Sequence, residues 1–505
     1  MNRKFLSLDE LIALSEQYRS QGESIALCHG TFDLLHIGHI RHLAAARCEC
    51  DRLLITITAD AHVNKGPGRP VFNEQLRAEQ LAAIEYIDGV AINYEATSVN
   101  VIHAIKPTVY IKGKDYKNNQ EDVTGNIQKE KKAVESCGGY IAYTDELTFS
   151  SSQLLNEHFE VFSPETKDYL DKFKQQHSCK EVIAAIETLK DLRVLVVGDT
   201  IIDEYYYTST LGQSGKYNVL ATRFNSSERF AGGAVAVANH VASFVNSVTL
   251  FTGFGEQKTE EAFVRSKLKD NVQIFFMEYP DASTLVKRRY VDDNMTKLFE
   301  VYYGGEYSPD AGLDEYACQW LHHHLAEFDV VVVPDYGNGF ITDSMIQALC
   351  QQSRFLAVNT QINSGNRGFH VITRYPKIDF VSLNEPELRL AAHSQHKDLT
   401  DLMNTICQSL QASHIAITRG TEGVLMQDSG LSAHQVPALS TRVVDRVGAG
   451  DAFLAMASIL LGGRVKSELV AFVASAAAAI DVQIVCNRDT IEPVNLYKYI
   501  TTLLK

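Results

Sequence analysis

The sequence predicts an α/β protein with two domains. Between residues 25 and 159, short apolar runs alternate with longer stretches of helical periodicity, as in a parallel sheet with helices on its faces. A second α/β pattern starts abruptly at the apolar run of residues 193–197, after a polar stretch. A chain of 505 residues is also too long for one ordinary hydrophobic core. We therefore expect domains at residues 1–160 and 191–505, joined by a helical linker at residues 161–190.

The composition argues against several classes of protein. Hydrophobic residues make up 45% of the chain and charged residues 22%, as in soluble globular proteins. A formal net charge of −15 disfavours binding to nucleic acid or to an anionic membrane, so we expect small-molecule partners. The nine cysteines show no C-x-x-C or zinc spacing, which favours reduced thiols in a cytoplasmic protein. No signal peptide is evident, and the apolar segment 469–485 predicts a buried helix.

The first domain opens with a capping box. Ser7 and Glu10 stand three apart at the start of a helix expected to run to about residue 22. Strands are expected at residues 24–27, 52–58, 89–93, 108–111 and 140–143. Because ligands of parallel sheets bind beyond the carboxyl ends of the strands, the turn after the first strand is a candidate site.

That turn carries two histidines. Gly30 and Thr31 form a tight turn, and His36 and His39 follow on what is expected to be the first turn of a helix, so both rings face the same way. A helix N-terminus has unpaired N–H groups that suit a phosphate. A histidine pair alone is more often structural. A strand, a glycine turn and two histidines together favour a nucleoside triphosphate site.

The run Gly-Thr-Phe-Asp-Leu-Leu-His-Ile-Gly-His at residues 30–39 resembles the signature of the HIGH-motif nucleotidyltransferases. The resemblance implies a Rossmann-like domain that promotes in-line attack on the α-phosphate of a nucleotide and releases pyrophosphate. Segments 65–77, 111–116 and 148–152 resemble parts of sugar-phosphate adenylyltransferases, although the last could be ordinary helix capping. The implied catalytic residues are His36, His39 and Lys65, and the implied nucleotide contacts are Gly30, Thr31, Phe32, Lys112, Asp115, Ser150, Ser151 and Ser152.

The nucleotide is less well determined. Cytidylyl members of this group often carry an arginine just before the serine cluster, and residues 144–147 contain none. The sequence therefore favours ATP and leaves CTP open.

Residues 192–505 resemble the ribokinase-like (PfkB) sugar kinases. The resemblance is carried by Gly198-Asp199 with Asp203, by the Gly232-Gly233 loop, and by the Gly-Ala-Gly-Asp run at residues 448–451. It implies a ribokinase-like α/β fold with a small β lid, in which Asp203 binds substrate hydroxyls. Alternating Lys287 and Arg289 share one face of a basic strand, and would hold a substrate phosphate unless the strand is an exposed part of the lid.

The run at residues 448–451 is the most specific of these motifs. Glycines at a helix start leave N–H groups free around a transferring phosphoryl group. Asp451 could be a plain helix cap, but the resemblance implies a general base, and a carboxyl with a pKa near ~3.9 is ionised at neutral pH. The Asn384 and Glu387 pair is a weak signal for Mg²⁺ bound through water. The implied nucleotide contacts are Asn384, Glu387, Thr418, Gly420, Gly423, Gly448, Ala449 and Gly450.

The two halves together resemble bifunctional heptose-phosphate kinase/heptose-1-phosphate adenylyltransferases with the domain order reversed. The resemblance implies Mg²⁺ and ATP, sugar phosphorylation by the C-terminal domain, and nucleotidyl transfer to a sugar 1-phosphate by the N-terminal domain. A separate phosphatase is expected if the kinase product is a bisphosphate, and a homodimer is expected by analogy. The alternatives are a cytidylyltransferase for a polyol phosphate fused to a sugar kinase, and a binding or regulatory protein. The second alternative is motivated by Ala236, where these kinases usually carry a substrate-contacting asparagine.

Overall fold

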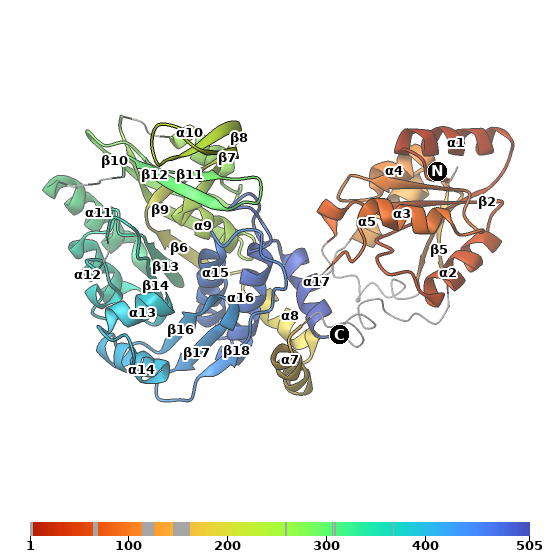
Figure 1. Ribbon diagram of the computed structural model, residues 1–505. Coiled ribbons are helices and arrows are strands. Elements are labelled where there is room, and N and C mark those ends of the chain that lie inside the picture. The colour runs from red at the N-terminus through yellow and green to blue at the C-terminus, as the bar shows by residue number, and fades with distance from the viewer. Residues whose placement is uncertain are drawn as a thin grey trace. The chain divides into compact units, whose positions relative to one another are not determined.

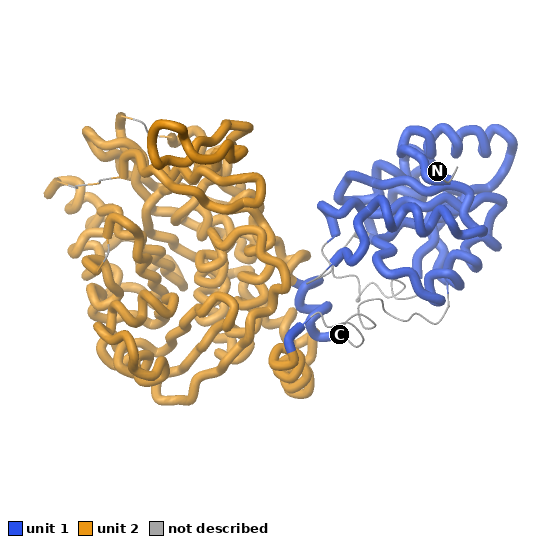
Figure 2. The backbone as a smooth tube through the Cα atoms, in the orientation of Figure 1, with its two compact units in different colours: residues 1–163, 497–505 blue, residues 164–496 orange. Residues whose placement is uncertain are grey.

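The structure is a computed structural model of the chain (Figure 1). It describes residues 4–63, 69–113, 126–144, 162–257, 260–305, 307, 310–366 and 368–505. The chain divides into two compact units, residues 1–163 with 497–505 and residues 164–496 (Figure 2). Each unit is described by itself below.

The first unit contains a five-stranded sheet in the order β3-β2-β1-β4-β5, and all its strand pairs are parallel. Its strands are β1 (Ile25–Gly30), β2 (Arg52–Thr58), β3 (Gly89–Asn93), β4 (Val109–Gly113) and β5 (Tyr140–Thr144). The helices of this unit are α1 (Leu8–Ser20), α2 (Ile37–Cys48), α3 (Glu74–Ala82), α4 (Val99–Ile105) and α5 (Asn126–Ser136). The five expected strands and the parallel sheet are therefore confirmed.

Alternating side chains of β1 pack into two separate hydrophobic cores. Ala26 and Cys28 belong to one cluster of buried residues, and Ile25 and Leu27 belong to another. A strand buried on both faces reads as a continuous apolar run, as residues 25–28 do. The expected capping box is confirmed at α1, where the Glu10 N–H donates to Ser7 and the Ser7 N–H donates back to the Glu10 carboxylate at 2.7 Å.

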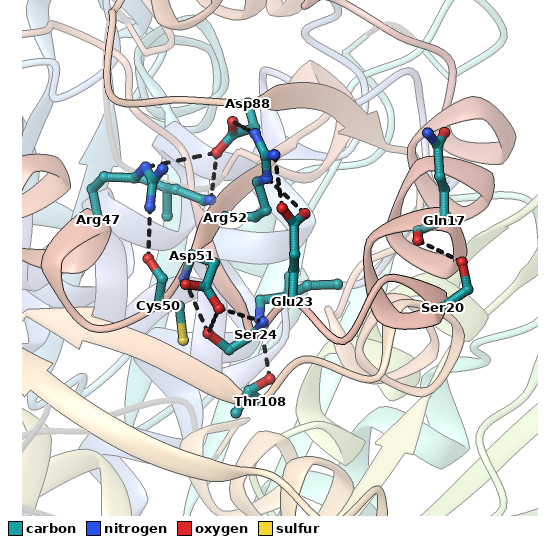
Figure 3. A network of polar contacts seen from close by, with 12 residues as sticks. Gln17, Ser20, Glu23, Ser24, Arg47, Cys50, Asp51, Arg52, Asp88 and Thr108 are labelled. Atoms are coloured by element: carbon teal, nitrogen blue, oxygen red, sulfur yellow. Dashed lines mark hydrogen bonds and ion pairs between the residues drawn. The ribbon is translucent and has the colours of Figure 1, made fainter.

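A polar network ties the amino-terminal edge of this sheet together (Figure 3). Arg52 pairs with Glu23 at 2.8 Å and with Asp88 at 3.1 Å. Nearby, the Ser24 hydroxyl donates to Asp51 at 2.6 Å. These residues precede or begin β1, β2 and β3, so the network lies at the opposite end of the strands from the histidine turn.

The second unit contains a nine-stranded sheet in the order β10-β9-β6-β13-β14-β15-β16-β17-β18, with β17 and β18 antiparallel at one edge. The other pairs are parallel, and β13 is buried along its whole length. The strands are β6 (Arg193–Val197), β9 (Ser247–Gly255), β10 (Val272–Tyr279), β13 (Val330–Asp335), β14 (Leu356–Thr360), β15 (Phe380–Asn384), β16 (His414–Thr418), β17 (Val424–Asp428) and β18 (His434–Val436).

A separate four-stranded sheet, in the order β12-β11-β7-β8, forms the small lid that the fold class implied. Its strands are β7 (Thr200–Gln213), β8 (Leu220–Gly233), β11 (Leu285–Val291) and β12 (Lys297–Tyr303). The hairpin β7–β8 is antiparallel, whereas β11 runs parallel to β7. The lid strands therefore bring segments from residues 200–233 and 285–303 side by side, as Figure 1 shows.

Most of the helices after residue 163 belong to the second unit, and the last of them is divided between the two units at residue 497. They are α7 (Pro164–Gln176), α8 (Cys179–Glu187), α9 (Ala234–Ala242), α10 (Glu261–Lys267), α11 (Ala311–His324), α12 (Asp343–Gln352), α13 (Glu385–Ala391), α14 (Leu399–Ser409), α15 (Ala449–Gly462), α16 (Ser467–Asp481) and α17 (Pro493–Leu503). Phe173 of α7 stacks on Phe472 of α16 with ring centroids 4.2 Å apart, so α7 packs within the second unit. The buried helix expected in segment 469–485 is confirmed as α16. No helix in the described part of the chain is long and apolar enough to cross a membrane.

Candidate functional sites

The histidine pair lies where β1 gives way to α2. His36 is the N-cap of α2, one position outside the first turn, and its Nδ1 accepts from the Gly38 N–H at 3.1 Å. This corrects the expected placement of His36, because an N-cap residue is extended rather than helical. The rings of His36 and His39 still face each other, with centroids 4.1 Å apart.

The tautomer of His36 follows from this cap. A neutral imidazole whose Nδ1 accepts a hydrogen bond carries its proton on Nε2, and burial lowers the pKa of His36. The Nε2 atom is buried and has no hydrogen-bond partner among the described residues. His36 can therefore offer an N–H donor to a phosphate oxygen.

The residues around this pair hold the turn in shape. Phe32 is buried at a φ of +47°, and its ring lies 5.6 Å from that of His39. Gly30 lies beneath that ring, since a Cβ on Gly30 would be 3.2 Å from it. The fully buried Arg77 donates to the carbonyl of Thr31.

Asp33, to which the sequence pattern assigned no role, binds a distant loop. Its carboxylate accepts from the Val71 N–H at 2.6 Å and forms a buried ion pair with Arg69 at 3.6 Å. A buried carboxylate needs hydrogen bonds or an opposite charge to be stable. Arg69 and the Val71 N–H meet this need for Asp33. The contact fixes the residues after position 68 against the histidine turn.

Lys112 lies at the carboxyl end of β4, which pairs directly with β1. Its Nζ forms an ion pair with Glu130 at 3.1 Å and lies 3.5 Å from the carbonyl of His29. Burial and the Lys112 charge together lower the pKa of His29 to about 3. The structure thus brings Lys112 to the same sheet edge as the histidine turn. The remaining candidates of this site, Lys65, Asp115, Ser150, Ser151 and Ser152, lie outside the described residues.

In the second unit, the lid supplies the candidate substrate residues. Asp203 of β7 stands in register with Lys287 of β11 and forms an ion pair with Arg289. All three side chains are buried, and Lys287 and Arg289 share one face, as the alternation predicted. The alternative of an exposed lid strand is wrong, because most side chains of β11 are buried.

Gly232 is required by close packing. A Cβ at Gly232 would lie 2.0 Å from Oδ2 of Asp203, and one at Gly233, which has a φ of +62°, would lie 2.5 Å from the carbonyl of Asp199. The glycine pair therefore makes room for the Asp203 carboxylate and for the turn beneath it.

Lys287 and Arg289 differ in the ion pairs that they form. Arg289 pairs with Asp203 and with Glu300, the latter at 3.4 Å. Burial lowers the pKa of Lys287, and its Nζ lies 5.4 Å from the ring of Tyr302. Lys287 is thus the more available cation for a substrate phosphate.

Asp451 lies in the first turn of α15, after the N-cap Gly448. The hydroxyl of Tyr336, which follows β13, donates to Asp451 Oδ1 at 2.7 Å. Burial raises the pKa of Asp451 to about 7; the Tyr336 bond and the Lys287 charge oppose this rise, and the Asp203 charge adds to it. The expectation of an ordinary, fully ionised carboxylate at neutral pH is therefore wrong. Tyr336 had no role assigned from the sequence, although it stands in the Asp-Tyr-Gly turn of residues 335–337.

The glycine run before Asp451 is shaped by its neighbours. Gly448 has a φ of +103°, and a Cβ there would be 2.7 Å from Asp481 and 2.9 Å from Asn487. A Cβ at Gly450 would meet nothing within 4 Å, so the start of α15 is open on that side. Ala449 is the first residue of the helix. The N–H groups of this open helix start can bind a phosphoryl group.

The candidate nucleotide residues gather at the carboxyl ends of β15 and β16. Asn384 and Thr418 are the last residues of these strands and stand in register. The next turn carries Gly420 and Gly423 at positive φ, and a Cβ at Gly423 would lie 2.0 Å from the carbonyl of Val436. These candidates are far apart in the sequence and share one edge of the sheet.

Asn384 and Glu387 form a capping box at the start of α13. The Glu387 carboxylate accepts from the N–H groups of Asn384 at 2.8 Å and Ile362 at 3.2 Å, and burial raises its pKa to about 7. No group of three or more His, Cys, Asp or Glu side chains suited to a metal occurs in the described ranges. A role of Asn384 and Glu387 in holding Mg²⁺ through water stays a prediction.

Both halves of the chain are similar to known proteins. Residues 191–489 match the family model described as pfkB family carbohydrate kinase, and residues 27–158 match the model described as Cytidylyltransferase-like. Over 144 residues the chain is 44% identical to the Bifunctional protein HldE of Methylobacillus flagellatus, and over 141 residues it is 43% identical to that of Nitrobacter winogradskyi. These matches cover 28% and 27% of this chain and 28% of each relative, so the chain spans less than a third of the length of these curated relatives.

Solved structures share the fold of the second unit. Phosphofructokinase-2 from Escherichia coli in complex with fructose-6-phosphate has a TM-score of 0.51 and 16% identity, over 62% of this chain and 100% of that chain. The same enzyme in complex with potassium also gives a TM-score of 0.51, at 17% identity, over 61% of this chain and 99% of that chain. At such identities the likeness establishes the ribokinase-like fold alone.

Proposed function

This chain belongs to the pfkB family of carbohydrate kinases, and from that premise we propose that it is a bifunctional sugar-activating enzyme. The C-terminal domain transfers the γ-phosphoryl group of ATP to a hydroxyl of a sugar or sugar phosphate. The N-terminal domain transfers a nucleotidyl group from ATP to a sugar 1-phosphate and releases pyrophosphate. The single observation that carries the kinase assignment is the Tyr336–Asp451 hydrogen bond at the open start of α15.

The kinase step follows from the residues around Asp451. The acceptor hydroxyl binds at Asp203, and Asp451 takes its proton as the oxygen attacks the γ-phosphorus and the bond to the β-phosphate oxygen breaks. The N–H groups at the start of α15 and the Lys287 ammonium stabilise the charge on the phosphoryl oxygens. When bound, Mg²⁺ neutralises phosphate charge, and Asn384 and Glu387 would hold it through water.

The nucleotidyl step needs no covalent intermediate. An oxygen of the sugar 1-phosphate attacks the α-phosphorus of ATP, and pyrophosphate leaves on the opposite side. The Nε2–H of His36 is the donor available to the charged oxygens of this transition state, and His39 lies against it. Lys112, at the same sheet edge, adds positive charge.

A cytidylyltransferase acting on a polyol phosphate is the second candidate for the N-terminal domain. The cytidylyltransferase is favoured because residues 27–158 match a family described as Cytidylyltransferase-like. ATP is favoured because no arginine stands just before the serines at positions 150–152. Turnover of CTP against ATP separates the two. A regulatory protein with an inactive kinase domain is motivated only by Ala236, and the paired Asp451 and Tyr336 speak against it.

Oligomeric state and pathway are part of the proposal. Leu211, Phe224 and Phe299 of the lid strands are each at least half exposed, which favours a homodimer formed through the lid. If the kinase makes a bisphosphate, a separate phosphatase must act before nucleotidyl transfer.

The test is a panel of sugars and sugar phosphates with the full chain, Mg²⁺ and either ATP or CTP. ADP and pyrophosphate are measured separately, so the two halves are scored independently. Asp451→Asn should abolish ADP formation, while Asp398→Asn, at the N-cap of α14 in the same unit, should not. A panel that yields no pyrophosphate with any sugar phosphate would overturn the nucleotidyl half, and equal ADP formation in both variants would overturn the kinase half.

A further inference from the structure

Asp445 is a buried acidic residue that the proposed chemistry does not use. It stands three residues before Gly448, it is buried, and it accepts hydrogen bonds from two different parts of the fold. The first part is the surroundings of the glycine run: the Val447 N–H of its own loop donates to Oδ1 at 3.2 Å, and the N–H of Cys486, in the segment after α16, donates to Oδ2 at 3.1 Å. These bonds hold the backbone that leads into the glycine run.

The second part is the lid. The hydroxyl of Tyr205 in β7 donates to Asp445 Oδ2 at 2.5 Å, and Nζ of Lys297 in β12 lies 3.4 Å from Oδ1. One carboxylate thus joins two lid strands to the loop that carries the proposed base. The side chain of Asp445 is 4% exposed and that of Lys297 is 40% exposed.

The same lid strand carries the substrate residue. Tyr205 lies two positions after Asp203 on β7, so both side chains point to one face of the strand. Arg289, which pairs with Asp203, stands in register with Tyr205. A displacement of the lid that moves Asp203 therefore also moves the Tyr205 hydroxyl that binds Asp445.

We infer that Asp445 is a positioning residue that couples the lid to the phosphoryl-transfer loop, so that nucleotide binding at the loop and closure of the lid favour each other. This inference rests on the proposed kinase function. It names the contact through which binding of the nucleotide and binding of the sugar affect each other. Coupling of this kind is reciprocal, because each ligand must stabilise the arrangement that the other prefers.

The inference is tested by hydrogen exchange on the full chain with AMP-PNP and Mg²⁺ as the probe, in the absence of any sugar. In the wild-type protein, the nucleotide should slow amide exchange in β7 and β12 by about fivefold or more. Lys297→Met should lose most of this slowing and still bind AMP-PNP at the loop. Lys216→Met, an exposed lysine in the turn between β7 and β8, is the matched control and should behave as wild type.

Asp445→Asn provides a second variant of nearly the same shape. It retains an acceptor for Tyr205 but removes the charge that Lys297 pairs with, so it should resemble Lys297→Met. Binding of AMP-PNP without any change in lid exchange in the wild type, or equal slowing in wild type and Lys297→Met, overturns the coupling and leaves the kinase proposal intact. Failure of AMP-PNP to bind the wild-type chain overturns both.

Discussion

Removing the Tyr336 hydroxyl tests whether Asp451 is the base of the kinase reaction. The hydroxyl donates to Asp451 Oδ1 at 2.7 Å, and this bond opposes the rise in the pKa of Asp451 that burial causes. Burial and the neighbouring Asp451 charge raise the pKa of Tyr336 well above its ordinary value, so the hydroxyl stays a donor throughout an ordinary assay range. Tyr336→Phe should therefore raise the pKa of Asp451 above its value of about 7.

The size of the effect follows from the strength of the bond. A hydrogen bond to a charged group contributes about 1.5–3 kcal/mol, which corresponds to roughly one to two pKa units. Because Asp451 keeps some contact with solvent, we expect the lower end of this range, a rise in its pKa of about one unit. The ionised fraction at pH 7 would then fall from about one half to about one tenth, a loss of roughly fivefold in kcat/KM.

The assay is the pH dependence of kcat/KM for ADP formation. The acidic limb should move to higher pH in Tyr336→Phe, and most of the lost activity should return at about pH 9. Tyr207→Phe, which removes a tyrosine–carboxylate bond to Glu228 within the lid, is the control and should leave the limb in place. An acidic limb that stays at the same pH in Tyr336→Phe would refute the assignment of the limb to Asp451.

Three further predictions test other parts of the molecule. Gly232→Ala should raise KM for the sugar roughly tenfold or more in steady-state assays and leave KM for ATP unchanged. The reason is that the new Cβ would lie 2.0 Å from Asp203 Oδ2 and displace that carboxylate. An unchanged KM for the sugar would contradict the substrate role of Asp203. His36→Ala and His39→Ala should each lower pyrophosphate release about a hundredfold without affecting ADP formation, and a parallel loss of both activities would argue against separate sites. Asp451→Asn should melt at a higher temperature than wild type at pH 8 in differential scanning fluorimetry. The pKa of Asp451 is raised from 3.8 to about 7 in the folded protein, so the folded wild type loses stability as the pH rises through that window. The higher melting temperature of Asp451→Asn must therefore vanish near pH 4.

Much of the first unit could be predicted from local sequence. Each strand of its parallel sheet is a short apolar run, and residues 25–28 feed cores on both faces of the sheet, so the run has no polar interruption. The position of His36 was missed by one residue. A helix N-cap is chosen by which side chain can accept from the next N–H groups, and histidine is not a usual cap.

The partners of Asp451 and Asp445 could not be predicted. Tyr336 lies 115 residues before Asp451, and nothing in either local pattern says that the two side chains meet. The raised pKa of Asp451 has the same origin, because burial and the approach of Asp203 are properties of the assembled fold. Lys297 and Tyr205 likewise reach Asp445 only once the lid sheet has formed.

The sequence by itself determined the two α/β folds and indicated candidate residues for their chemistry. Apolar periodicity and glycine turns act over a few neighbouring residues, so they are visible in the chain before it folds. The tertiary structure alone decided the raised pKa of Asp451, the ion pair of Arg289 with Asp203, and the contacts from the lid to Asp445. These depend on dielectric environment and on contacts between distant strands, which exist only when the sheets have assembled.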